Sequence, residues 1–195
     1  MSKEKPKYNQ ILDAAVQVIA ENGYHRSQVS KIAKKAGVAD GTIYLYFKNK
    51  EDLLVSLFQE KMGSFIDRIR FATEDKQSAD EKLFALIDTH FRQLSEDTHL
   101  AVVTQLELRQ SDKILRQQIN AVLKGYLQII DHIIQSGMEE GTFHNHLNIK
   151  LVRQMIFGML DEVVTNWVMK DQRYDLTGQA KDVHFLISNG LKKHT

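Results

Sequence analysis

Residues 38–47 combine side chains that could together contact a duplex groove. The segment is typical of a short helix, in which Ile43 and Phe47, spaced i to i+4, share one face and anchor it to a core. That orientation leaves Thr42, Tyr44, Leu45 and Tyr46 facing outward. Hydroxyl groups donate to phosphate oxygens, and apolar side chains contact the methyl group of thymine. This segment therefore has the chemistry of a DNA-contacting surface.

The residues before this segment complete a helix-turn-helix. A second helix is predicted after Ser27, whose hydroxyl is placed to cap it, and its inner face consists of Val29, Ile32, Ala33 and Ala36. Gly37 supplies the sharp turn, because glycine adopts positive φ at little steric cost. In this motif the second helix lies in the major groove and the first crosses the backbone.

Further helices must hold this motif in place. Apolar spacing predicts one helix from Tyr8 to Asn22 and another from the Asn49 cap to about Phe71, with Glu51 and Asp52 in its first turn. Beyond these we expect helices at about 79–95, 99–109, 112–139, 148–170 and 176–193. The sequence therefore predicts an all-α fold of about nine helices, with a helix-turn-helix DNA-binding domain at 1–50 and a helical ligand-binding and dimerisation domain at 51–195.

Composition narrows the class of protein. The chain has 195 residues, 43% of them hydrophobic and 26% charged, as in globular proteins. It has no cysteine, which excludes thiol catalysis and thiolate metal sites, and we expect no metal, no cofactor and a cytoplasmic location. The formal net charge is +1, but residues 1–50 carry +5 and the remainder −4, so positive charge lies where a polyanion could use it. A solvated basic surface is the alternative.

The segment SQVSKIAKKAGVADGTIYLYFKNKEDLL, residues 27–54, resembles the DNA-binding signature of the TetR family of repressors. The resemblance implies a homodimer that binds operator DNA. It places the family's DNA contacts on Ser27, Gln28, Gly41, Thr42, Tyr44, Tyr46 and Lys50. Lys50 would also bind phosphate at the N-terminus of the helix after Asn49. Ala39 departs from the family's more usual serine, which leaves the cap of the recognition helix in question.

Two apolar stripes on the predicted helix 148–170 indicate a dimer. One stripe comprises Ile149, Val152, Ile156, Leu160, Val163 and Trp167, and the other Leu151, Met155 and Met159. We expect one stripe to face the core and the other a second subunit, in a four-helix bundle completed by Leu176, Ala180, Val183, Ile187 and Leu191. Two-fold symmetry would favour a palindromic operator. Alternatively, both stripes face one large core.

The middle and C-terminal helices carry a second resemblance. The segments TQLELRQS, LKGYL, RQMIFGMLDEVV and TNWVM are similar to the TetR-type FadR repressors of fatty-acid degradation in Gram-positive bacteria. This implies release from operators of β-oxidation genes by a long-chain acyl-CoA. Apolar placement then suggests an acyl site among Phe91, Val102, Leu106, Leu123, Tyr126, Met155 and Met159, with the CoA phosphates near Arg109, Lys113, Arg116 and Lys124. Core packing and a solvated charged face are the alternatives.

Other functions are less well supported. A TetR-type repressor could answer to a different hydrophobic ligand, as drug-efflux regulators do, and the basic N-terminal region alone could belong to a nonspecific architectural protein. His144-Asn145-His146 matches the letters of a nuclease motif but lacks its surrounding strands. No phosphate-binding glycine loop, HExxH helix or cysteine nucleophile occurs, so no enzyme is expected.

Overall fold

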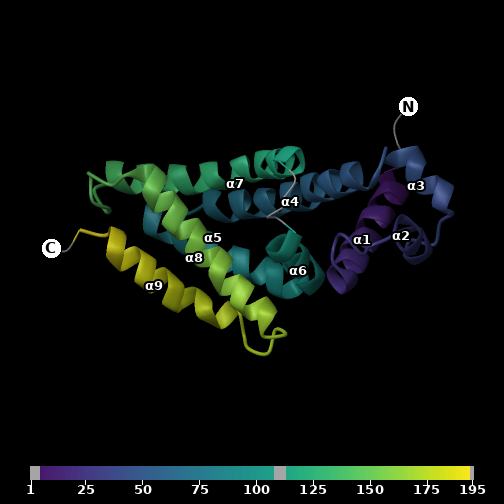
Figure 1. Ribbon diagram of the computed structural model, residues 1–195. Helices are drawn as coiled ribbons and strands as arrows, with labels where there is room; N and C mark the ends of the chain where they lie inside the picture. The colour runs from purple at the N-terminus through teal and green to yellow at the C-terminus, as the bar shows by residue number, and fades with distance from the viewer. Residues whose placement is uncertain (1–4, 108–112, 194–195) are drawn as a thin grey trace. The chain divides into compact units, whose positions relative to one another are not determined.

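The computed structural model describes residues 5–107 and 113–193, with the side chain of Lys5 left out. Within these residues the chain is all α, which confirms the predicted fold class (Figure 1). The helices are α1 (Lys5–Asn22), α2 (Val29–Lys35), α3 (Asp40–Tyr46), α4 (Lys50–Glu74), α5 (Ala79–Glu96), α6 (Thr98–Glu107), α7 (Lys113–Glu139), α8 (Ile149–Met169) and α9 (Ala180–Leu191), with a 3-10 turn η1 (Thr177–Gln179) before α9. No helix in the described ranges is long and apolar enough to cross a membrane.

The helices form two compact units. The N-terminal unit contains the residues up to Gly63 together with Thr98–Val122, and the C-terminal unit contains Ser64–Asp97 together with the residues from Leu123 onward. Two of the three boundaries fall inside α4 and α7, so each of these helices contributes residues to both units.

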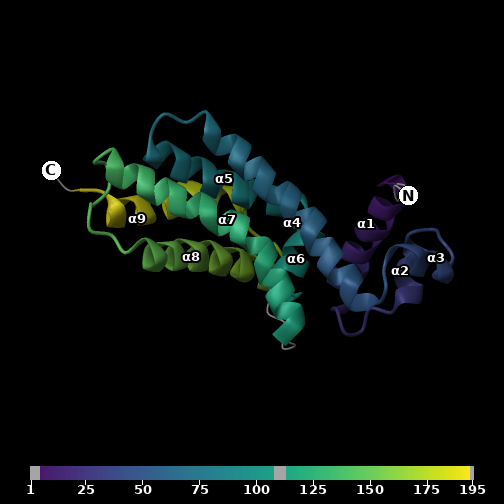
Figure 2. The ribbon, with the colours of Figure 1, turned by 90° about the horizontal axis from the view of Figure 1, so that it is seen from above.

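In the N-terminal unit, α1, α2 and α3 lie together around a small core (Figure 2). The predicted inner residues of α1, including Ile11 and Ile19, are buried. Gly23 and Gly37 adopt positive φ at the two turns, as the turn at Gly37 requires. Asn49 caps α4 as predicted, because its side chain accepts a hydrogen bond of 2.8 Å from the backbone N–H of Asp52.

The predicted cap on α2 is wrong. The helix begins at Val29, and its N-cap residue is Gln28, which makes no side-chain capping bond. Ser27 is fully buried instead, and its hydroxyl lies 2.7 Å from the carbonyl oxygen of Gly23 and 3.1 Å from that of Val18. Serine before a helix has the local signature of a cap, but here its hydroxyl fastens the turn back onto α1.

In the C-terminal unit, α5 begins with a capping box made by Ser78 and Glu81. In the first turn of the helix, the carboxylate of Asp80 accepts hydrogen bonds from Ser188 Oγ (2.5 Å) and Lys192 Nζ (2.9 Å), and His184 Nε2 lies 3.1 Å from it. Burial alone would raise the pKa of Asp80, but these hydrogen bonds hold it below its usual value. This network fastens the start of α5 to α9 and the residue that follows it.

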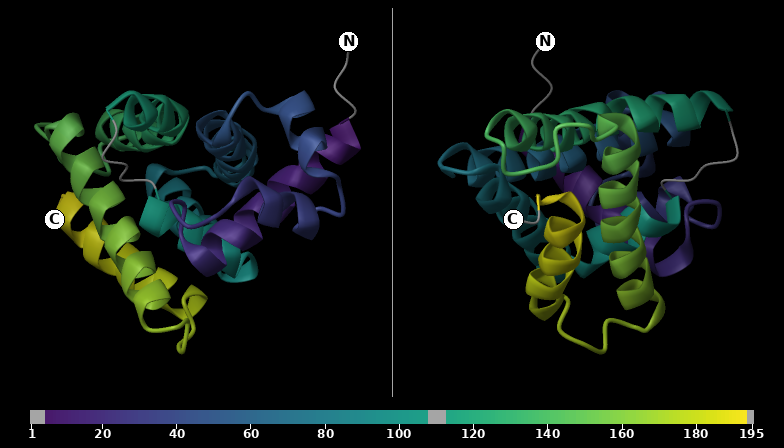
Figure 3. Two further views of the ribbon diagram at one scale, coloured as in Figure 1. Left: turned by 45° about the vertical axis from the view of Figure 1, so that its right-hand side comes forward. Right: turned by 90° about the vertical axis from the view of Figure 1, so that its left-hand side faces the viewer.

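The two stripes predicted on α8 face different surroundings. Val152, Ile156, Leu160 and Trp167 are buried, whereas Leu151 and Met155 are 52% and 61% exposed. Figure 3 shows α8 and α9 as antiparallel helices that both extend to the same side of the loop between them. The stripe predicted to complete the intersubunit bundle on α9 is buried within its own chain, so that assignment was wrong; the exposed large apolar residues of α9 are Phe185 and Leu186.

A glycine near the end of α7 generates a stability prediction. A β-carbon at Gly137 would overlap the ring of Phe143, which is fully buried and whose N–H donates to the Gly137 carbonyl at 2.9 Å. We expect Gly137→Ala to lower the free energy of unfolding by about 1–3 kcal/mol, because the ring must leave its packed position. Urea unfolding followed by circular dichroism measures this.

Gly63→Ala is the matched control. Gly63 lies in the middle of α4, where an added β-carbon meets no described atom within 4 Å. Because alanine is the better helix former, this variant should gain up to about 1 kcal/mol. A Gly137→Ala protein as stable as wild type would contradict the packing described for Phe143.

Candidate nucleic-acid interface and effector site

The helix α3 presents the predicted face to solvent. Ile43 and Phe47 are buried, at 2% and 1% exposed, whereas Tyr44 is 58% and Leu45 77% exposed. Gly41 is also exposed, and Thr42 and Tyr46 are half-buried. The Tyr46 ring lies 6.3 Å from the ring of Tyr8 on α1, which itself stacks on Phe47 at 5.1 Å. The inward orientation of Ile43 and Phe47 is therefore confirmed, and so is the outward orientation of Tyr44 and Leu45, whereas Thr42 and Tyr46 are only partly exposed.

Neither helix of the helix-turn-helix has a side-chain capping bond at its N-terminus. Ala39 is the N-cap of α3 and makes no side-chain capping bond, as its departure from serine suggests. Asp40 lies in the first turn, where its negative charge offsets the positive end of the helix dipole. Gln28 is exposed at the start of α2, but the buried hydroxyl of Ser27 faces its own chain. The predicted set of DNA contacts is thus exposed or half-exposed except at Ser27.

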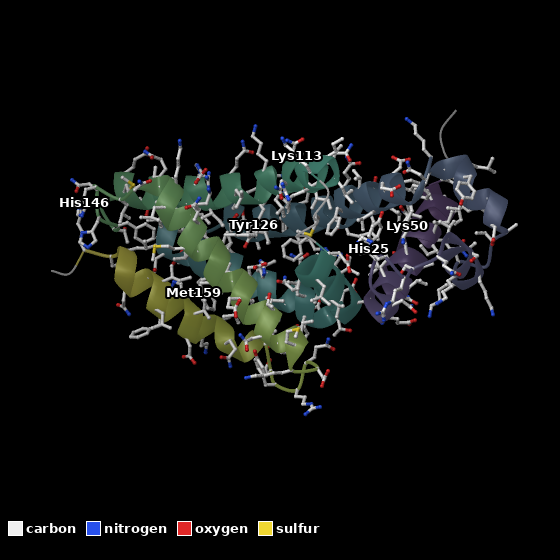
Figure 4. The ribbon with its side chains drawn as sticks, viewed as in Figure 1. His25, Lys50, Lys113, Tyr126, His146 and Met159 are labelled. Carbon is white, nitrogen blue, oxygen red and sulfur yellow. The ribbon has the colours of Figure 1, made fainter. Side chains whose placement is uncertain are left out.

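Lys50, the first residue of α4, is held by the loop between α1 and α2 (Figure 4). Its Nζ donates to the carbonyl oxygen of His25 at 3.2 Å and lies 4.4 Å from the centre of the Tyr24 ring. The backbone N–H of Tyr24 in turn donates to Glu107 at 3.0 Å. Burial lowers the pKa of Lys50, although the charges of Glu51 and Glu107 oppose this shift. The ammonium is therefore fixed beside a helix N-terminus.

Sequence reasoning missed the role of Glu107. It lies 83 residues after Tyr24, and periodicity within one helix carries no signal for a pair so far apart.

Exposed cations lie on and beside the helix-turn-helix: Arg26, Lys31, Lys34, Lys35 and Lys48. Together with Lys50 they place a cluster of positive charge on this unit.

The predicted effector residues are divided between the two units. Phe91, Leu123 and Tyr126 are buried in the C-terminal unit, and Met159 on α8 is half-buried. Val102, which is half-buried, and Leu106, 51% exposed, belong to α6 in the N-terminal unit.

Met155 faces outward, which does not support its place in an acyl site. Among the predicted basic residues, Arg109 lies outside the described residues, and Lys113, Arg116 and Lys124 are exposed.

A buried polar pair lies at the centre of the C-terminal unit. His90 Nδ1 on α5 is 2.9 Å from the hydroxyl of Tyr126 on α7. Aromatic rings surround the pair: Phe65 and Phe91 lie 5.2 and 5.8 Å from the His90 ring, and Phe157 lies 5.9 Å from Tyr126. Burial lowers the pKa of His90 to about 3 and raises that of Tyr126, so both groups are neutral at physiological pH.

A groove of about 440 Å³ follows α4 and α7 in the same unit. Its lining is Arg70, Thr73 and Glu74 from α4, Lys82 from α5, and Gly125, Gln128, Ile129, His132 and Ile133 from α7. Gly125 on α7 lies close to Ile66 on α4, since a β-carbon added at Gly125 would lie 3.6 Å from the Ile66 side chain. The groove therefore combines apolar side chains with charges of both signs.

The histidines of the loop between α7 and α8 do not form a metal-binding group. The rings of His144 and His146 lie 5.3 Å apart. Over the described ranges, no three histidine, aspartate or glutamate side chains are placed to hold a metal ion.

The chain matches known proteins over nearly its whole length. Residues 11–57 match the bacterial regulatory proteins of the tetR family, and residues 58–190 match the C-terminal region of YsiA-like proteins. The fatty acid metabolism regulator protein of Bacillus subtilis (strain 168) is 59% identical over 191 residues, which cover 98% of each chain.

Two solved structures agree with this match. The fatty acid degradation regulator FadR from Bacillus halodurans has a TM-score of 0.91 and 62% identity, covering 95% of this chain and all of that one. FadR from Bacillus subtilis, solved in complex with stearoyl-CoA, has a TM-score of 0.91 and 60% identity, covering 94% of this chain and 98% of that one. With a helix-turn-helix whose outer face is exposed and a helical C-terminal region, the chain belongs to the TetR family of bacterial transcriptional regulators.

Proposed function

We propose that the protein is a cytoplasmic transcriptional repressor of fatty-acid degradation genes that long-chain acyl-CoA releases from palindromic operators. The observation that carries this proposal is identity of about 60%, over nearly the whole chain, to a fatty-acid regulator solved with stearoyl-CoA. Residues 1–50 would form the DNA-binding domain and residues 51–195 the ligand-binding and dimerisation domain. The protein would act as a regulator and not as an enzyme.

The N-terminal unit provides the chemistry for operator binding. Tyr44 and Leu45 would contact base edges and thymine methyl groups, with Gly41 letting the backbone approach closely. Thr42, Tyr46, Gln28 and Lys50 would contact phosphates and so set the register on the duplex. Ser27 would contribute by shaping the turn through its bonds to α1.

The exposed apolar residues of α8 and α9 support a homodimer. Leu151, Met155, Phe185 and Leu186 are all more than half exposed and lie on α8 and α9, two consecutive helices of one unit. A surface of this kind is typical of a subunit interface. Pairing across a two-fold axis would place two α3 helices about 34–36 Å apart, the spacing of successive major grooves.

Release would follow from differential affinity. Acyl-CoA must bind more tightly to a conformation in which the two recognition helices no longer fit the operator. Because α4 runs without interruption from Lys50 into the C-terminal unit, a shift of its C-terminal half can move the Lys50 end. The Glu107–Tyr24 contact adds a second route, from the end of α6 to the loop that holds Lys50.

In this proposal, the first prediction concerns Tyr44. With an operator selected from a random duplex library by the wild-type protein, Tyr44→Ala should weaken binding by about 1–3 kcal/mol while leaving a folded dimer. The variant Tyr44→Phe keeps the aromatic ring and removes the hydroxyl, so it measures the contribution of the hydroxyl alone. Phe71→Ala serves as control, since Phe71 is 73% exposed but lies in the C-terminal unit. Unchanged binding by Tyr44→Ala in a fluorescence anisotropy titration would count against α3 as the recognition helix.

The second prediction concerns the dimer. Phe185→Glu and Met155→Glu should each weaken self-association by about 2 kcal/mol or more, because each would bury an unpaired carboxylate at the proposed interface. Sedimentation equilibrium measures the dissociation constant. Phe71→Glu introduces the same charge at an aromatic residue on α4 that is at least as exposed, and should leave the dimer intact. Dimers of equal strength in all three variants would contradict the assigned face.

The third prediction concerns chain length. Acyl-CoAs from eight to twenty carbons should release operator DNA with rising potency, because each added buried methylene contributes about 0.8 kcal/mol until the chain exceeds its site. Free CoA should not release DNA. The measurement is operator dissociation at fixed protein and salt concentration. Absence of release at every length would reject the effector and leave operator binding in place.

A further inference from the structure

A buried ring nitrogen of His90, in the C-terminal unit, has no hydrogen-bond partner among the described residues. His90 has one ring nitrogen, Nδ1, at 2.9 Å from the Tyr126 hydroxyl (Figure 4 labels Tyr126). Its other nitrogen, Nε2, is buried and has no hydrogen-bond partner among the described residues. Buried N–H groups without an acceptor are rare in folded proteins, and those that occur call for a functional explanation.

The surroundings determine which nitrogen carries the proton. The ring is neutral because it lies entirely out of water among Phe65, Phe91 and Tyr126. A phenol is a more acidic donor than a neutral imidazole, and an imidazole nitrogen is a more basic acceptor than a phenol oxygen. On these grounds we assign the Tyr126 hydroxyl as the donor to Nδ1, which places the proton of the ring on Nε2.

We propose that the Nε2–H of His90 donates a hydrogen bond to the thioester carbonyl oxygen of the acyl-CoA effector, with Tyr126 as the positioning residue that holds the ring. This inference rests on the proposed function and names the group that the effector site recognises. The thioester carbonyl is the uncharged acceptor attached directly to the acyl chain. A fatty-acid carboxylate fits less well, because aromatic surroundings penalise a buried charge.

Neither His90 nor Tyr126 lines the groove, but two helices that carry or contact this pair continue into it. On α7, Ile129 lies one turn after Tyr126 and Ile133 two turns after it, and both isoleucines line the groove. On α4, Phe65 contacts the His90 ring, and Arg70 and Thr73 line the groove further along the same helix. Gln93 donates to the Phe65 carbonyl at 3.2 Å, which holds the ring-bearing turn of α4 against α5.

The test compares two effectors that differ only at the carbonyl. Stearoyl-CoA carries the thioester, and S-octadecyl-CoA is the thioether in which a methylene replaces the carbonyl. With full-length wild-type protein bound to operator, stearoyl-CoA should act at about tenfold lower concentration, the effect of one buried hydrogen bond. His90→Phe should bring this ratio close to one. His90→Gln, which keeps an N–H donor, should restore part of the preference.

An NMR measurement on the wild-type protein tests the same hydrogen bond without any substitution. With ¹⁵N-labelled histidine, stearoyl-CoA should shift the His90 Nε2–H resonance and the thioether should not. Equal potency of the two ligands on wild type, or a preference that survives in His90→Phe, would overturn the inference while both ligands still release DNA. Failure of both ligands to bind or release would overturn the inference together with the proposed function.

Discussion

The burial of Ile43 and Phe47 is the constraint on which the DNA-binding surface depends. A helix of seven residues is too short to be stable by itself, so tertiary contacts set both its existence and its rotation about its axis. Burying each of these side chains contributes about 1.5–3 kcal/mol, and the Tyr8 ring stacked on Phe47 closes the same core. Once this pair faces inward, Tyr44 and Leu45 must face outward. The recognition face is thus a consequence of packing on its opposite side.

The same reasoning applies to α8, whose two apolar faces have different surroundings. One face supplies Ile156, Leu160 and Trp167 to the core of its unit, and the other leaves Leu151 and Met155 exposed. The Asp80 network fastens α5 to α9 and so supports the helix that carries Phe185 and Leu186. Hydrogen bonds within the chain thereby hold the exposed apolar side chains of α9 in a defined position.

The sequence allowed prediction of those features that arise from spacing within one helix. The inward pair on α3, the Asn49 cap and the two faces of α8 all belong to this group and agree with the structure. Ser27 and α9 were misassigned because a serine before a helix and an apolar stripe have the same local signature whether they serve a cap, a turn, a core or a partner. Only the tertiary structure distinguishes these uses.

Contacts between residues far apart in the chain had no signal at all. Glu107 contacts Tyr24, 83 residues away in the sequence, and His90 contacts Tyr126, 36 residues away. The local sequence around one residue does not predict its partner in either pair. Met155 was placed in an acyl site because it is apolar, but its face of α8 points to solvent. A family resemblance therefore indicated the class of ligand more reliably than apolar placement indicated the residues that bind it.

Hydroxyl-radical footprinting of the full-length protein on its selected operator tests the central claim most directly. Two α3 helices related by a two-fold axis should give two protected patches on one face of the duplex, centred about 10 base pairs apart, and stearoyl-CoA should remove both. Continuous protection without such periodicity, or patches that persist at saturating stearoyl-CoA, would contradict the account of an effector-released repressor.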